Sequence, residues 1–96
     1  MSISVILELN IKPEFIADFE AGIKQAFPET RAFPGCISVN ACRHESRPNT
    51  YLFLEHWREQ ADYENYIKWR TETAFMEQLM AIIASPPVSR VLQVVA

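Results

Sequence analysis

The chain has 96 residues, of which 49% are hydrophobic and 22% charged, and its formal net charge is −3 at pH 7. A chain of this length buries roughly 60 to 65% of its unfolded surface, so we expect residues 1–96 to form a single domain. The charge balance gives no basic surplus for binding phosphates, and we therefore expect no nucleic-acid partner.

The N-terminal stretch MSISVILELNIKPEF is an apolar run broken by polar and acidic side chains. It fits neither a signal peptide nor a membrane span, so we expect a cytoplasmic protein without membrane contact. Apolar residues at every second position predict a strand from Ile3 to Leu9. Pro13 then suits a first helical position, and an apolar stripe predicts a helix from Pro13 to Phe27. We expect Pro28 to bend or interrupt this helix, with room for one short turn through Arg31.

Two strands follow, Cys36 to Arg43 and Thr50 to Trp57, joined by the polar hairpin HESRPN. In the first strand, alternation places Ile37 with Val39 on one face and Asn40 on the other. The second strand is substantially apolar on both faces. In one extended strand Cys36 and Cys42 lie about 20 Å apart, too far for a disulfide bond, and no cluster of metal-ligating residues accompanies them.

Helical spacing returns between Glu59 and Ala84 and predicts two helices or one broken helix, ended by two prolines. A last β-branched strand is expected from Val88 to Val95. The order βαββαβ predicts a ferredoxin-like α+β fold with an antiparallel sheet and helices on one face. Because the second face is also apolar, we expect a second copy of the sheet to cover it, which predicts a homodimer.

The string RAFPGCISVNACRHESRPNTYLFLEHWREQADYENYI resembles the antibiotic-biosynthesis monooxygenase family of the dimeric α/β-barrel superfamily. The shared features are the turn at residues 34–36, the Glu-x-Trp strand end at Glu55 and Trp57, and the helix that begins near Glu59. The resemblance implies a dimeric α/β barrel. It also implies oxidation of a quinol-like or phenolic molecule by molecular oxygen, with no metal, flavin or haem cofactor.

The chain departs from the family's pattern where many members carry histidines in the helix after the Glu-x-Trp strand. Alignment on Trp57 places Tyr66 and Thr71 at these positions. No histidine follows His56, which argues against haem breakdown. Two other functions stay open: a non-catalytic protein that binds a small ligand or serves a stress-related role, and an isomerase of small oxo-acids or lactones.

The candidate catalytic residues are His56, Tyr63 and Tyr66, and the candidate substrate-binding residues are Trp57, Glu55 and Asn40. Imidazole ordinarily exchanges protons near neutrality, and a tyrosine hydroxyl can hydrogen-bond to a phenolic oxygen. Each candidate also has a structural interpretation: the aromatic rings fit core positions, and His56 shares a face with leucines. For Glu55 we expect either a role in proton transfer or an ion pair with Arg43 or Arg90.

Overall fold

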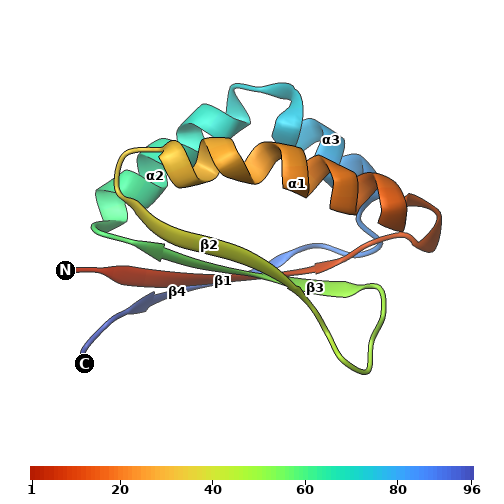
Figure 1. Cartoon of the computed structure of the whole chain (residues 1–96), viewed down its shortest axis with the longest axis horizontal. Helices are drawn as coiled ribbons and strands as arrows, with labels where there is room; N and C mark the ends of the chain where they lie inside the picture. Colours follow the sequence, from red (N-terminus) through yellow and green to blue (C-terminus); the bar gives the residue numbers. More distant parts are fainter.

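In the computed structural model, which describes all 96 residues, four strands form one antiparallel sheet in the order β2-β3-β1-β4, and the helices cover one of its faces (Figure 1). The strands are β1 (Ile3–Asn10), β2 (Cys36–Arg43), β3 (Thr50–Trp57) and β4 (Val88–Gln93). The helices are the 3-10 helix η1 (Pro13–Phe15) and the α-helices α1 (Ile16–Ala32), α2 (Gln60–Thr71) and α3 (Ala74–Ile82). This arrangement confirms the ferredoxin-like α+β fold, with two helices between β3 and β4.

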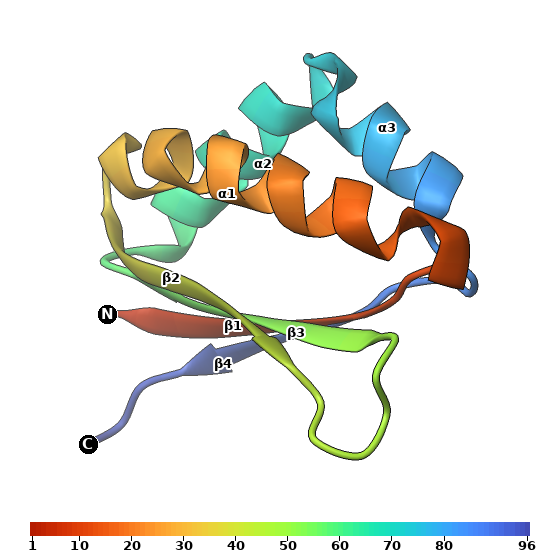
Figure 2. The ribbon, with the colours of Figure 1, turned by 45° about the vertical axis from the view of Figure 1, so that its right-hand side comes forward.

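The sheet is open in the single chain, with β2 at one edge and β4 at the other. Its lower face is free of helices in both views (Figures 1 and 2). One chain therefore does not form a closed barrel, and closure by a second chain stays a proposal. No helix is both long enough and apolar enough to span a membrane.

Helix α1 continues through Pro28 to Ala32, so Pro28 does not interrupt the helix, and the short turn expected through Arg31 is part of it. A proline inside a helix removes one backbone donor, a cost that tertiary contacts can offset. Here Arg70 of α2 donates from Nη2 to the Ala26 carbonyl at 3.0 Å and to Thr30 Oγ1 at 3.0 Å. These bonds hold α1 on both sides of Pro28, which itself stays exposed.

The helix-facing side of the sheet carries the core. Strands β1 and β3 pair so that Val5 lies opposite Glu55 and Ile3 opposite Trp57. A large apolar cluster lies toward α1 and α3; its buried members are Leu9, Ile11, Phe19, Ile23, Phe27, Val39, Tyr51, Phe53 and Leu79. A smaller cluster lies toward α2; its buried members are Ile3, Val5, Trp57 and Tyr66. Of the six candidate residues, Trp57 and Tyr66 belong to this smaller cluster, and Tyr63 packs against it.

Strand β2 contains a bulge that the sequence alternation does not show. The register shifts between Cys36 and Ser38, so Cys36 lies opposite Trp57, and Ile37 is left out of the pairing. Ile37 is 56% exposed and does not share the buried environment of Val39, contrary to expectation. A bulge adds one residue to one strand, which shifts the side-chain alternation by one position. Cys36 therefore lies partly buried beside the small cluster.

The helix-free face carries apolar side chains among polar ones across β1 and β3. By register, Ile6 lies opposite Leu54 and Glu8 opposite Leu52 on this face. Leu92 of β4 extends the same surface beside Ser4 and is 46% exposed. Strand β4 ends at Gln93 rather than at Val95. In the single chain, the side chains of Ile6, Leu54 and Leu92 on this face therefore keep part of their apolar surface in contact with water.

Candidate functional site

Glu55 is a buried carboxyl group in the middle of the sheet, on the side that the helices cover. It lies on β3 with Val5 of β1 and Val39 of β2 opposite it, and only 6% of the residue is exposed. Its Oε1 accepts a hydrogen bond of 3.0 Å from the indole Nε1 of Trp57. Residues two apart on a strand project to the same face, so the Glu-x-Trp spacing itself places this pair together.

Burial raises the pKa of the Glu55 carboxyl above its ordinary value, and the hydrogen bond from Trp57 offsets part of that rise. The expected ion pairs of Glu55 with Arg43 or Arg90 do not occur in the chain. Arg43 instead lies 3.6 Å from Glu20, and Arg90 lies opposite Ile6, on the helix-free face. No arginine or lysine therefore neutralises Glu55.

Only one oxygen of Glu55 is committed. Oε1 accepts from Trp57, whereas Oε2 has no hydrogen-bond partner within the chain. Every fully enclosed side-chain nitrogen or oxygen atom does have a partner, so Oε2 must keep some contact with solvent. This oxygen is available to a small molecule that reaches the cluster.

Trp57 is fully buried and forms the wall of the cluster. Its ring centroid lies 5.1 Å from that of Tyr66, 6.0 Å from that of Tyr63 and 6.3 Å from that of Phe33. These distances are typical of packed aromatic pairs. The structure thus brings together four of the candidate residues where β3 meets α2: Glu55 and Trp57 from the strand, Tyr63 and Tyr66 from the helix.

Tyr63 is half-buried, and the pKa of its hydroxyl is raised, chiefly by burial. The negative charge of Glu55 raises this pKa further, and the Ser89 hydroxyl lowers it in part. The pKa of the Cys36 thiol is raised for the same two reasons, burial first and Glu55 second. The phenol and the thiol therefore stay protonated near neutral pH. Tyr63 can donate a hydrogen bond, and Cys36 is not a thiolate nucleophile.

The hydroxyl of Tyr66 is already engaged. It lies 2.7 Å from Thr30 Oγ1, and it accepts from Nε of Arg70 at 2.9 Å. Burial raises the pKa of this hydroxyl, and the bonds to Thr30 and Arg70 lower it in part. The network joins α1 to α2, so the position of Tyr66 is structural in the first place.

Arg70 and Thr30 are not among the candidate residues expected from the sequence. Arg70 follows Tyr66 by four residues, so the two lie on one face of α2, and this face packs toward the core. A charged residue on the apolar stripe of a helix was the available signal, since such residues are rarely buried without partners.

His56 and Asn40 lie on the other face of the sheet. His56 pairs with Ser4 in the register, is exposed, and has Nδ1 2.9 Å from Ser4 Oγ. Asn40, on β2, lies opposite Leu54 of β3 and is exposed as well. Within one chain, the sheet thus separates His56 and Asn40 from Glu55 and Tyr66.

Two cavities lie elsewhere. One, of about 480 Å³, opens between α1 and the α2–α3 pair and is bordered by Arg70. The other, of about 390 Å³, lies between α1 and β2 and is bordered by Asn40, Arg43 and Tyr51. Neither cavity is lined by Glu55 or Trp57. No three His, Cys, Asp or Glu side chains are grouped as ligands for a metal ion.

The fold is shared with solved structures. A conserved protein from Methanosarcina mazei superposes with a TM-score of 0.90 at 19% identity, covering 97% of this chain and 92% of that chain. The crystal structure of an antibiotic biosynthesis monooxygenase superposes with a TM-score of 0.88 at 20% identity, covering 98% of this chain and 99% of that chain. Similarity at these identities establishes the fold alone.

Sequence comparison reaches further. An uncharacterized protein of Synechocystis is 32% identical over 79 residues, which are 81% of this chain and 53% of that protein. The chain therefore spans about half the length of this relative. Residues 2–78 match the model of the antibiotic biosynthesis monooxygenase family, and the chain belongs to this family.

Proposed function

We propose that the protein is a monooxygenase that oxidises a quinol-like or phenolic small molecule with molecular oxygen and without a cofactor. The observation that carries this proposal is the carboxyl of Glu55. This group is buried, has a raised pKa and keeps one oxygen free beside the rings of Trp57 and Tyr63. A carboxylate with a raised pKa is a better match for the weakly acidic phenol O–H than an ordinary one. The family to which the chain belongs supports the same reaction class.

The first step is proton transfer. The phenolic O–H of the substrate gives its proton to Oε2 of ionised Glu55, and Trp57 keeps Oε1 in place. Tyr63, which stays protonated, donates a hydrogen bond to the resulting oxyanion. We assign this donor role to Tyr63 rather than Tyr66, because the hydroxyl of Tyr66 is bonded to Thr30 and Arg70.

The oxidation needs no external reductant. The phenolate gives one electron to oxygen, and the substrate radical and superoxide join in a C–O bond, which leaves a peroxide anion. This anion takes the proton back from Glu55, and the hydroperoxide loses water from a carbon that still carries hydrogen. In sum, the phenolic O–H, one ring C–H and O₂ become a quinone, with a new carbonyl at the attacked carbon, and water; the substrate supplies all four electrons.

Access to Glu55 is expected between α2 and β4. Val91 lies opposite Val5, on the helix-facing side of the sheet, and is 45% exposed. Tyr63 on α2 is half-buried beside Ser89, which belongs to β4 like Val91. An aromatic molecule entering at this edge would meet Tyr63 first and Glu55 behind it.

Oxygen consumption with a panel of hydroquinones and naphthols tests the proposal. We expect Glu55→Gln to lower the rate by about 10²- to 10⁴-fold and Tyr63→Phe by about 10²- to 10³-fold. Glu64→Gln, an exposed carboxylate on α2, is the matched control and should change little. If His56→Ala abolishes turnover while Glu55→Gln does not, the base is on the opposite face and the assignment to Glu55 is wrong.

Two other outcomes would replace the proposal itself. Tight binding of these molecules without oxygen uptake would make the protein a ligand-binding member of the family. Conversion of small oxo-acids or lactones without oxygen uptake would make it an isomerase.

A further inference from the structure

The cavity between α1 and the α2–α3 pair contains a buried cation that lacks a close anionic partner. The side chain of Arg70 is 5% exposed, and its nearest carboxylate is Glu29, whose Oε1 lies 4.0 Å from Nη1. The side chain of Glu29 is itself 61% exposed. Buried charges are normally paired with a close opposite charge as well as hydrogen-bonded, and the loose pair with Glu29 is an exception.

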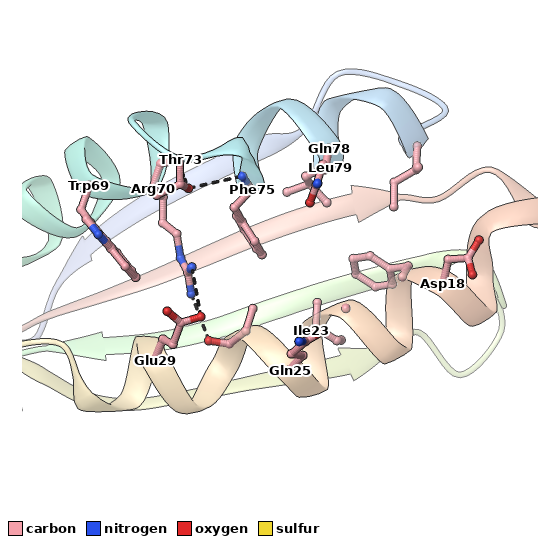
Figure 3. A pocket seen from close by; sticks show the side chains of 14 residues that line it. Asp18, Ile23, Gln25, Glu29, Trp69, Arg70, Thr73, Phe75, Gln78 and Leu79 are labelled. Atoms are coloured by element: carbon pink, nitrogen blue, oxygen red, sulfur yellow. Dashed lines mark hydrogen bonds and ion pairs between the residues drawn. The ribbon is translucent and has the colours of Figure 1, made fainter.

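The remaining edges of the guanidinium are committed. Nε donates to Tyr66, and Nη2 donates to the Ala26 carbonyl and to Thr30. Aromatic rings lie on either side of the group (Figure 3), with the carbon of the guanidinium 4.5 Å from the centroid of Trp69 and 4.4 Å from that of Phe75. Nη1 has no hydrogen-bond partner, because Glu29 lies 4.0 Å away, and it remains for an added acceptor.

The rest of the cavity is largely apolar. Its apolar lining comes from both sides of the groove: Phe19, Ile23, Ala26, Trp69, Phe75, Leu79 and Ile82. Arg70 lies at one end of this groove and Asp18 at the other (Figure 3). The volume of about 480 Å³ is within the range of small-molecule sites.

We propose that this cavity binds a small monocarboxylate with an apolar body, its carboxylate on Nη1 of Arg70 and its body along Ile23 and Leu79. The carboxylate replaces the loose pair with Glu29 by a close, charge-assisted hydrogen bond. Asp18 at the far end disfavours the opposite orientation. The site is separate from Glu55 and does not depend on the oxygenase reaction.

Isothermal titration calorimetry with decanoate tests the proposal, and 1-decanol is the uncharged comparison. We expect decanoate to bind at least 10-fold more tightly than decanol, because a hydrogen bond to a charged group contributes about 1.5–3 kcal/mol and 1.4 kcal/mol is tenfold. Arg70→Met should abolish this preference. Circular dichroism must show that the variant is folded, since Arg70 also bonds to α1.

Two variants test the site without touching Arg70. Gly22 lines the cavity, and a Cβ added at this position meets no atom within 4 Å. Gly22→Leu should therefore fill the groove and weaken decanoate binding by 10-fold or more, whereas Ala21→Leu, on the same helix outside the cavity, should not. Glu29→Gln removes the competing carboxylate and should tighten binding. Equal affinity for decanoate and decanol, or decanoate binding that survives Gly22→Leu, would overturn the proposal.

Discussion

Trp57 donates its indole N–H to Oε1 of Glu55 over 3.0 Å, from the same face of the same strand. This bond gives the carboxyl one neutral partner and no cation. A neutral donor fixes the position of a carboxylate without removing the cost of burying its charge. Glu55 is therefore held in one position while its pKa stays raised, as the proposed proton transfer requires.

The first prediction concerns Glu55→Gln and stability. The folded pKa of Glu55 lies above its ordinary value of 4.5, so the protonated carboxyl contributes fully to stability below pH 4.5. This contribution is lost as the pH rises through the folded pKa, because the buried group then becomes charged. The amide of glutamine keeps an acceptor for Trp57 and carries no charge. We expect the variant to be more stable than wild type at pH 7, by about 1.4 kcal/mol for each pH unit between 4.5 and the folded pKa of Glu55.

Urea unfolding followed by tryptophan fluorescence between pH 4 and pH 8 measures this difference. The gain should shrink toward pH 4, where wild-type Glu55 is protonated as well. Glu64→Gln on the surface of α2 should stay within about 0.5 kcal/mol throughout. A variant that is less stable than wild type at pH 7 would contradict the cost assigned to the buried charge.

The second prediction concerns Gly35, which ends the turn before β2. Its φ is +89°, and a Cβ at this position would overlap the side chain of Asp62 in the first turn of α2. The Gly35 carbonyl also accepts a hydrogen bond from the backbone N–H of Arg58 at 2.9 Å, so the turn cannot shift freely. We expect Gly35→Ala to lower the free energy of unfolding by about 2–4 kcal/mol. Chemical denaturation measures it, and a loss below about 0.5 kcal/mol would show that the turn can relax.

The third prediction is the same substitution at the other glycine, with the opposite sign. Gly22 is an exposed position inside α1, and an added Cβ has no atom within 4 Å. Alanine restricts the unfolded chain and has a higher helix propensity, so Gly22→Ala should raise the free energy of unfolding by about 0.5–1 kcal/mol. Thermal unfolding at matched protein concentration checks it. A lower midpoint would mean that α1 needs glycine for a reason other than space.

Local patterns predicted most of the fold because hydrophobic periods of two and near 3.6 residues are short-range properties. They gave strand β3 its bounds and placed Glu55 with Trp57. They failed at Pro28 and at Ile37, where the outcome depends on other elements. Helix α1 is held past Pro28 by Arg70 of α2, and the bulge at Ile37 is visible only in the pairing of β2 with β3.

The grouping of the candidate site was only partly predictable for a related reason. Adjacent residues on a strand face opposite sides, which separates His56 from Glu55 and could be read from the sequence. The commitment of the Tyr66 hydroxyl could not, because Thr30 lies 36 positions away along the chain. Likewise, burial of Arg70 depends on α1 packing over α2, which no local pattern specifies.

The last prediction is the homodimer, with the helix-free face of the sheet as the interface. Leu92 on this face is 46% exposed, and partly buried apolar residues of β1 and β3 continue the surface. Two such sheets packed together would bury about 2,000 Å² or more, in the range of permanent dimers.

Sedimentation equilibrium should then give twice the chain mass of 11.1 kDa. Leu92→Asp should shift the mass toward the monomer, because it places a charge in the interface while costing the single chain little. Met80→Asp is the matched control, since Met80 is 52% exposed on α3 and away from the sheet. Equal effects of the two substitutions, or a monomeric wild type at high concentration, would show that the helix-free face is not the interface.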